Sequence, residues 1–290
     1  MNRRHFLASM IAAVPLSTRG WARVLGAEET VFLVVGDWGT GGTLQRRIAA
    51  SMTRVARSSG ASFVVSTGDN IYPDGVDSAT DPQWKTKYEN IYKDLALPWW
   101  AVLGNHDHRG EPDAQIQYAR TNPRWNMPGR TWCKDIPAGA AAGASILGID
   151  TTPMVQGASG WKEQLTWLDQ TLSARSGRAT MVVGHHPLRS YGHYGDTSVL
   201  VKNLKPLLDK HSVKAYMCGH EHDMQLVRNP DDRFSCLVSG GGGGERAAKS
   251  GEHSRIAYTG GGFALMRLGT AELSAEMFDS HGVTRGRFVL

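Results

Sequence analysis

The sequence feature that most constrains the fold is the alternation of short apolar runs with longer stretches of helical periodicity. Six runs rich in Val, Ile and aromatic residues each lead into a glycine-containing segment, which is typical of β-strands. These predicted strands are 31–35, 63–66, 99–103, 145–149, 180–183 and 213–217. Between the first two, Leu44, Ile48, Met52 and Val55 recur at the spacing of an amphipathic helix. Alternating strands and helices predict an α/β domain with a largely parallel central sheet.

Two more helices are predicted further along the chain. Leu165, Leu168 and Leu172 lie on one helical face, and Ser159 is available as the N-terminal cap. Apolar residues over 199–207 predict a third helix that ends or breaks near the proline at position 206.

The pattern changes after residue 223. Four predicted strands follow one another without intervening helices, at 234–239, 263–268, 273–279 and 285–290. This arrangement is typical of an antiparallel region. Because the chain contains no Pro/Ser-rich linker and no repeat, we expect residues 28–290 to form one domain.

The N-terminal segment differs from the rest of the chain. Residues 1–27 contain the adjacent pair Arg3 and Arg4, no acidic residue, and an apolar stretch too short to span a bilayer. This pattern resembles a twin-arginine export signal, with small residues near Ala22 and Ala27 as cleavage points, although a disordered tail with two arginines is the alternative. We therefore expect the export machinery as a partner, a periplasmic or secreted protein, and no stable membrane insertion.

The positive charge of the chain resides mainly in this leader. The formal net charge is +5, and without residues 1–27 the chain has 28 basic and 27 acidic residues. A nearly neutral body is a poor electrostatic partner for a polyanion, which argues against nucleic-acid binding.

The cysteines exclude two common site classes. Cys133, Cys218 and Cys236 include no CxxC spacing, so zinc-finger and thioredoxin-like sites are excluded. An odd number of cysteines in an exported protein implies at least one free thiol or a bond between chains.

Five of the predicted strands end in a glycine followed at once by Asp, Asn or His. The carboxyl ends of parallel strands converge on one crevice, where α/β proteins bind ligands. We expect each glycine to allow a sharp turn that points the next side chain into this crevice. One such block alone is usually a simple turn, but five in order are hard to obtain by chance. The blocks are Gly36-Asp37-Trp38-Gly39, Gly68-Asp69-Asn70-Ile71-Tyr72, Gly104-Asn105-His106-Asp107, Gly184-His185-His186 and Gly219-His220-Glu221-His222.

The convergent side chains are those of a metal site. Two carboxylates, a phenol, an amide oxygen and three imidazoles suit a borderline-to-hard transition metal. There are too many donors for one tetrahedral ion, and about the right number for two ions that share a carboxylate, as in two-metal hydrolytic sites. The predicted ligands are Asp37, Asp69, Tyr72, Asn105, His185, His220 and His222.

These blocks resemble those of the purple acid phosphatases, within the calcineurin-like metallophosphoesterases, in order and over most of the chain after the leader. Segments 124–128, 215–222 and 238–240 are most similar to the small tartrate-resistant type. The resemblance implies an α/β fold in the form of a four-layer α/β/β/α sandwich, with two mixed sheets flanked by helices. It also implies an acid phosphatase that hydrolyses phosphate monoesters, with small phosphate esters, and phosphoproteins as a further class, as substrates.

The resemblance also implies how the ligands divide between two ions. The wider superfamily usually has Asp-x-His in the first block, whereas this chain has Asp37-Trp38-Gly39 and supplies Tyr72 instead. Because phenolate is a hard anionic donor, it favours Fe(III); the alternative for Tyr72 is a core aromatic. By the family pattern, Asp69 bridges the ferric ion and a divalent iron, zinc or manganese ion. The ferric ligands would be Asp37, Asp69, Tyr72 and His222, and the divalent ligands Asp69, Asn105, His185 and His220.

The implied mechanism is in-line attack of an Fe(III)-activated hydroxide on phosphorus, with a general acid that protonates the leaving oxygen. The family pattern indicates His106 as this acid and His193 as a second candidate. The comparable histidine of the tartrate-resistant type aligns one residue later, with Tyr194. His108 and His186 are expected in the outer shell or exposed, and the glycine run 240–244 is expected to form a turn at the rim of the site.

Two alternative functions stay open at this point. One is a phosphodiesterase or nucleotidase that uses the same dinuclear metal core. The other, from a different class, is a non-catalytic metal- or phosphate-binding protein, in which His106 would have no role.

Overall fold

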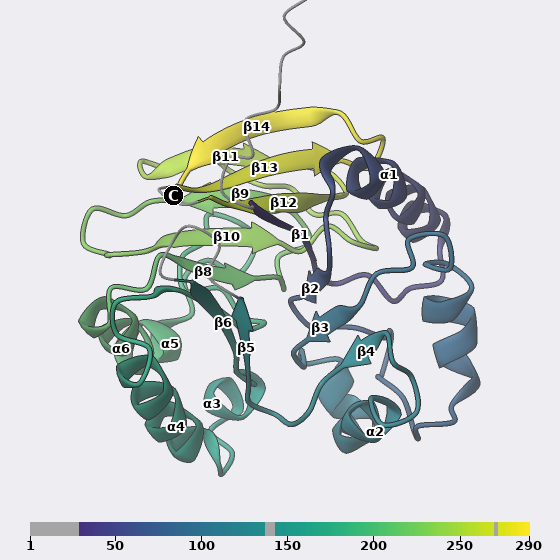
Figure 1. Ribbon diagram of the computed structural model, residues 1–290, viewed down its shortest axis with the longest axis horizontal. Coiled ribbons are helices and arrows are strands. Elements are labelled where there is room, and N and C mark those ends of the chain that lie inside the picture. Colours follow the sequence, from purple (N-terminus) through teal and green to yellow (C-terminus); the bar gives the residue numbers. More distant parts are fainter. Residues whose placement is uncertain (1–28, 137–142, 270–271) are drawn as a thin grey trace, which may run out of the picture.

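Two seven-stranded sheets form the centre of the protein, whose computed structural model describes residues 29–136, 143–269 and 272–290 (Figure 1). The first sheet contains, in spatial order, β14 (Thr284–Val289), β13 (Leu273–Asp279), β12 (Gly262–Leu268), β1 (Thr30–Val35), β2 (Val64–Ser66), β3 (Trp99–Ala101) and β4 (Trp125–Asn126). The second contains β11 (Ser254–Tyr258), β9 (Met224–Val227), β10 (Ser235–Ser239), β8 (Ala215–Cys218), β7 (Ala179–Val183), β6 (Ala144–Gly148) and β5 (Trp132–Ile136).

Both sheets are mixed, with a parallel part that leads into the five blocks. Strands β1, β2, β3 and β4 are parallel to one another, as are β6, β7, β8 and β10. The remaining strands, β5, β9 and β11 to β14, pair antiparallel with their neighbours.

Helices cover the outer side of each sheet and complete four layers (Figure 1). Against the first sheet lie α1 (Thr43–Ser59), the π-helix Trp84–Glu89 and α2 (Pro112–Tyr118); a short 3-10 helix, Asp107–Arg109, precedes α2. Against the second sheet lie α3 (Thr152–Gln156), α4 (Trp161–Ser173), α5 (Ser198–Asn203) and α6 (Lys205–Lys210). The α/β/β/α sandwich implied by the sequence resemblance is thus confirmed.

The continuous apolar character of β1 follows from its position between two cores. Phe32 and Val34 pack between the sheets, whereas Leu33 and Val35 pack toward α1 on the other face. Because successive side chains of a strand point to opposite faces, a strand buried on both faces must be apolar throughout.

Two local expectations were wrong, and a third was confirmed. Helix α4 begins after Gly160, which is left-handed (φ +89°) and provides no side-chain cap, so Ser159 is not the cap. The break expected near Pro206 is confirmed: the third helix is divided into α5 and α6, and Pro206 lies in the first turn of α6, where its missing N–H costs nothing. The region after residue 223 is not wholly antiparallel, because β10 lies parallel to β8.

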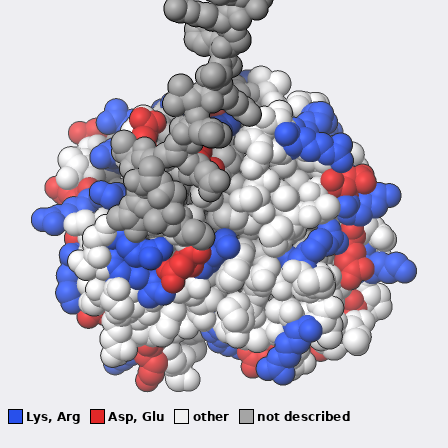
Figure 2. All heavy atoms as spheres, in the orientation of Figure 1, with Lys and Arg blue, Asp and Glu red and all other residues white. Residues whose placement is uncertain are grey.

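The leader predicted at residues 1–27 lies outside the described residues. None of the described helices is long and apolar enough to cross a membrane. The three cysteines are free thiols, with Cys218 and Cys236 buried. On the face seen in Figure 2, basic and acidic side chains lie interspersed.

Candidate metal centre

The five blocks lie at the ends of β1, β2, β3, β7 and β8 and are joined by hydrogen bonds from backbone amides, including one from the Gly219 amide to the His185 carbonyl (2.9 Å). The Asp37 amide donates to the Gly68 carbonyl (3.0 Å), which links the first two blocks. The His220 amide donates to Asp37 Oδ2 (2.8 Å), and the His106 amide donates to Asp69 Oδ1 (2.8 Å). Blocks from the two sheets are therefore held in fixed register at one place.

The first group of donor atoms surrounds the phenol of Tyr72. Its oxygen lies 3.0 Å from Asp37 Oδ1, 2.9 Å from Asp69 Oδ2 and 3.0 Å from His222 Nε2. Ligand atoms at right angles around an octahedral ion with short bonds lie about 3 Å from one another. This group therefore has the spacing of ligands around a single ion.

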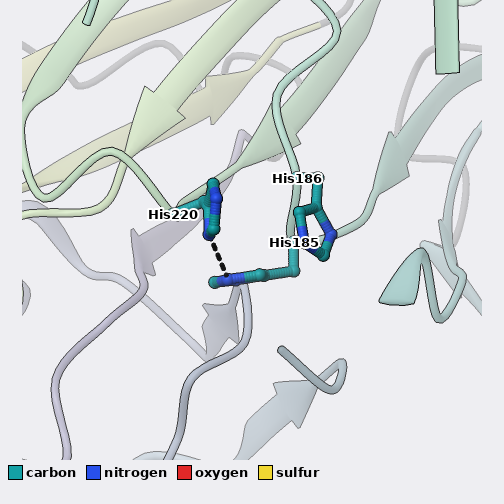
Figure 3. A group of neighbouring side chains, drawn as sticks. All are labelled: His185, His186 and His220. Atoms are coloured by element: carbon teal, nitrogen blue, oxygen red, sulfur yellow. Dashed lines mark hydrogen bonds between the residues drawn. The ribbon is translucent and has the colours of Figure 1, made fainter. Parts of the chain in front are cut away.

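The second group surrounds the imidazole of His185. Its Nε2 lies 3.2 Å from His220 Nδ1 (Figure 3). The same nitrogen lies 3.1 Å from Asn105 Oδ1 and 3.4 Å from Asp69 Oδ2. The same Asp69 oxygen is thus close to the donors of both groups. All seven predicted ligands come together, with Asp69 in the place of a bridging ligand.

A third imidazole accompanies the second group. His186 is 4% exposed, and its ring centroid lies 5.0 Å from that of His185 and 4.6 Å from that of His220 (Figure 3). Its Nδ1 lies 2.9 Å from the Thr151 hydroxyl. His185, His186 and His220 can therefore be read as a ligand group of their own, a possibility that the adjacent histidines in the sequence could have signalled.

The glycines of the blocks have a different role from the one expected. Of the five that begin a block, only Gly68 is left-handed (φ +94°). A Cβ on Gly104 would lie 2.2 Å from Asp69 Oδ1, and one on Gly219 would lie 2.3 Å from Asp37 Oδ2. The missing side chains therefore make room for the carboxylates. The left-handed conformation is instead adopted by four of the predicted ligands, a strain that often accompanies function: Asp37, Asp69, His220 and His222.

The electrostatics of the donor set suit cations. Burial, and then the charges of Asp37 and Asp69, raise the pKa of Tyr72 well above its ordinary value, so ionisation of this phenol requires a compensating positive charge. Burial and the neighbouring His185 lower the pKa of His220 to about 3, which leaves it as the neutral imidazole that binds metals. Burial alone would raise the pKa of Asp69, but the charges and hydrogen bonds of His185 and His106 hold it well below its usual range.

His106 lies beside the first group. Its ring centroid is 4.5 Å from that of Tyr72, and its Nδ1 lies within hydrogen-bond distance of the Pro73 carbonyl. A carbonyl can only accept, so this contact assigns the Nδ1 proton and leaves Nε2 as the atom that can exchange a proton with a ligand.

His193 lies farther out. It is exposed, and its ring packs edge-on against Tyr194 at 4.7 Å. It is Tyr194 that contacts a predicted ligand, because its ring stacks on that of His220 with centroids 4.4 Å apart and planes 25° apart. A catalytic role for His193 stays a prediction, without a described contact to the donor set.

Two buried carboxylates that sequence reasoning did not assign hold the blocks in place. Asp107 accepts hydrogen bonds from the backbone amides of Asn70 (3.0 Å) and Gly104 (2.8 Å). Burial, and then the charge of Asp69, raise the pKa of Asp107 to about 7. Glu221 faces away from the donors and accepts from the Ser190 hydroxyl (2.6 Å) and the Tyr194 amide (3.1 Å). The sequence signal that could have indicated this role is that both carboxylates lie inside the blocks.

A model of the family described as Calcineurin-like phosphoesterase matches residues 30–224. The chain belongs to this family. The phosphoesterase is 34% identical over 278 residues to purple acid phosphatase 4 of Arabidopsis thaliana, covering 87% of this chain and 80% of the relative. It is 31% identical over 287 residues to tartrate-resistant acid phosphatase type 5 of Rattus norvegicus, covering 87% of each.

Among solved structures, the phosphoesterase is similar to GAP50, described as the anchor in the inner membrane complex of Plasmodium. The TM-score is 0.82 at 25% identity, covering 90% of this chain and 88% of the other. The relatives confirm the predicted resemblance: the protein is a hydrolase of the purple acid phosphatase-like, dimetal phosphoesterase family.

Proposed function

We propose that this phosphoesterase is an exported acid phosphatase that hydrolyses phosphate monoesters with an Fe(III) ion and a divalent iron, zinc or manganese ion. The observation that carries the proposal is the position of Asp69 Oδ2, 2.9 Å from the Tyr72 phenol in one donor group and 3.4 Å from His185 Nε2 in the other. The arginine-containing leader supports export.

The donor set fits the proposed pair of ions. Asp37, Tyr72 and His222 would hold Fe(III), since the hard phenol oxygen lies between two carboxylates. Asn105, His185 and His220 would hold the divalent ion, and Asp69 would be shared. When bound, such a pair supplies positive charge to the phosphoryl oxygens and lowers the pKa of water, so that a nucleophile is available at acidic pH.

The chain's own groups then position the ester and handle the proton. The hydrogen bond of His106 to Pro73 orients its ring beside Tyr72, with Nε2 available to protonate the leaving oxygen. The Asp69 carboxylate also accepts the His106 amide, so the proposed acid and the proposed bridging ligand have a fixed relative position.

The proposed activity is tested with a matched pair of substrates. The metal-loaded phosphoesterase is expected to hydrolyse phenyl phosphate at acidic pH and to hydrolyse diphenyl phosphate far more slowly, measured as phenol release. Hydrolysis of the diester alone would favour the phosphodiesterase alternative. No hydrolysis of either ester by a fully metallated sample would favour a non-catalytic binding protein.

The proposed ferric site predicts a spectroscopic signature. A tyrosine bound to Fe(III) is expected to give the loaded protein a charge-transfer band in the visible range, and Tyr72→Phe is expected to lose it because the phenol oxygen is removed. The measurement is an absorption spectrum together with elemental analysis of both proteins. Tyr194→Phe is the matched control, since Tyr194 contacts His220 through its ring. A band that survives in Tyr72→Phe would exclude Tyr72 as the ferric ligand.

A further inference from the structure

Next to the donor set lies a positively charged pocket of about 410 Å³. It is lined by Gly192, His193, Arg246, Ala247 and Lys249. We propose that this pocket binds a second phosphoryl group of the substrate, so that the preferred monoesters are those of alcohols that carry another phosphate. This inference rests on the proposed phosphatase function and narrows its substrate class.

The pocket begins one aromatic ring away from a predicted metal ligand. The guanidinium of Arg246 lies over the ring of Tyr194, 4.9 Å from its centroid, and the ring of Tyr194 also stacks on that of His220. Arg246 also donates from Nη1 to the His220 carbonyl (3.1 Å) and from its amide to the His222 carbonyl (2.9 Å). A substrate bound at the metals can therefore extend over Tyr194 toward Arg246.

Both walls of the pocket pack against the block that contains the predicted ligands His220 and His222. The glycine run 240–244 brings the Arg246 wall close, because a Cβ on Gly244 would lie 2.5 Å from His222 Nδ1. On the opposite wall, Glu221 holds the Tyr194 amide, and a Cβ on Gly192 would lie 2.6 Å from Glu221 Cδ. The pocket is thus built into the site, so less ordering has to accompany binding.

The charge of the pocket is not neutralised by the part of the chain that the structure describes. The polar and aromatic partners of Arg246 are two carbonyls and a ring, and no described carboxylate forms an ion pair with Arg246 or Lys249. The adjacent Glu245 is engaged by the Gly261 amide (3.0 Å), and Glu221 is buried among its own donors. A guanidinium and an ammonium together match a phosphate dianion, and the guanidinium can bind it through two parallel hydrogen bonds.

The binding test uses phosphonates, which cannot be hydrolysed. Titration calorimetry of the metal-loaded protein compares butylphosphonate, butane bisphosphonate and the analogue with a terminal carboxylate. We expect the bisphosphonate to bind about tenfold tighter than butylphosphonate, well beyond the statistical advantage of its two identical ends. Arg246→Ala and Lys249→Ala are each expected to lower the ratio of bisphosphonate affinity to butylphosphonate affinity about fivefold. Lys202→Ala, on an exposed position of α5, changes the net charge equally and is expected to leave the preference unchanged.

A kinetic measurement distinguishes two roles of Arg246: binding of the second phosphate of the substrate, and support of the position of Tyr194. With butanediol monophosphate and butanediol bisphosphate as substrates, Arg246→Ala is expected to raise KM for the bisphosphate about fivefold at constant kcat, and Arg246→Lys to retain most of the preference. Equal effects on both substrates would reduce Arg246 to a support for Tyr194 and overturn the proposal, as would equal binding of all three phosphonates to the unmodified protein. Tightest binding of the carboxylate analogue would overturn the assignment to phosphate.

The two proposals fail in different ways. If the bisphosphonate binds more tightly but neither phenyl phosphate nor the butanediol esters are hydrolysed, phosphate binding in the pocket is supported and the proposed phosphatase function is wrong. If monoesters are hydrolysed without preference, the function stands and the pocket proposal fails. If no phosphonate binds to the loaded protein and none of the esters is hydrolysed, both proposals fail.

Discussion

Replacement of Asp69 by asparagine is expected to lower kcat/KM for phosphate monoesters by about a thousandfold or more. Asparagine keeps the shape of the side chain, but it removes the negative charge of a residue that lies close to both donor groups. Asp69 Oδ2 lies 2.9 Å from the Tyr72 oxygen and 3.4 Å from His185 Nε2, so both proposed ions would lose a shared anionic ligand at once. The variant is therefore expected to retain less than the full complement of metal.

The measurement for Asp69→Asn is steady-state kinetics combined with the number of metal ions per chain. Asp74→Asn is the matched control, because Asp74 lies nearby in the sequence, is exposed, and forms only a long ion pair of 3.5 Å with Arg109. Circular dichroism of both variants verifies that they are folded. Full metal content and near-normal activity in Asp69→Asn would mean that Asp69 is not shared between two ions.

The sequence patterns predicted most strands, and the seven predicted donors lie together in the structure, because both depend on local rules. A strand buried on two faces is apolar throughout, as in β1, and the turn that follows its carboxyl end delivers the next polar residue to the crevice. The short edge strands β4, β5 and β11 gave no comparable signal. Trp125–Asn126 has only two residues, and Ser254–Tyr258 is only partly buried, so neither shows the apolar run of a central strand.

Side-chain direction could not be predicted from the sequence, because it depends on contacts between segments far apart in the chain. The block glycines suggested turns, whereas Gly104 and Gly219 are needed because carboxylates from other strands occupy the space of their side chains. In the same way, the family pattern indicated His193 as a second candidate acid, whereas the loop anchored by Glu221 turns Tyr194 onto His220. Such choices belong to the packing of loops on one another, which no local periodicity encodes.

The block that supplies the Asp37 ligand is also built into the aromatic core, so Trp38→Ala is expected to weaken the fold and the site together. Trp38 is fully buried, packs edge-on against Tyr92 and Trp99 with ring centroids 5.5 and 5.1 Å away, and donates from Nε1 to the Ser66 hydroxyl (2.9 Å). Truncation of a buried aromatic to alanine costs about 3–5 kcal/mol of unfolding free energy. For a domain of this size, this corresponds to a Tm roughly 10 °C lower.

The Tm of Trp38→Ala should be measured without metal and again with metal, because a bound ion adds its own stabilisation to the folded state. Trp161→Ala is the matched control, since Trp161 is a half-buried tryptophan at the start of α4 on the opposite outer layer. It removes the same atoms at a smaller expected cost and leaves metal binding unchanged. Trp38→Ala is expected to show a smaller metal-induced rise in Tm as well, because the left-handed backbone of Asp37 (φ 58°) is held by the packing of the next residue. An equal rise in both variants would mean that the position of Asp37 is set by its hydrogen bond to the His220 amide alone.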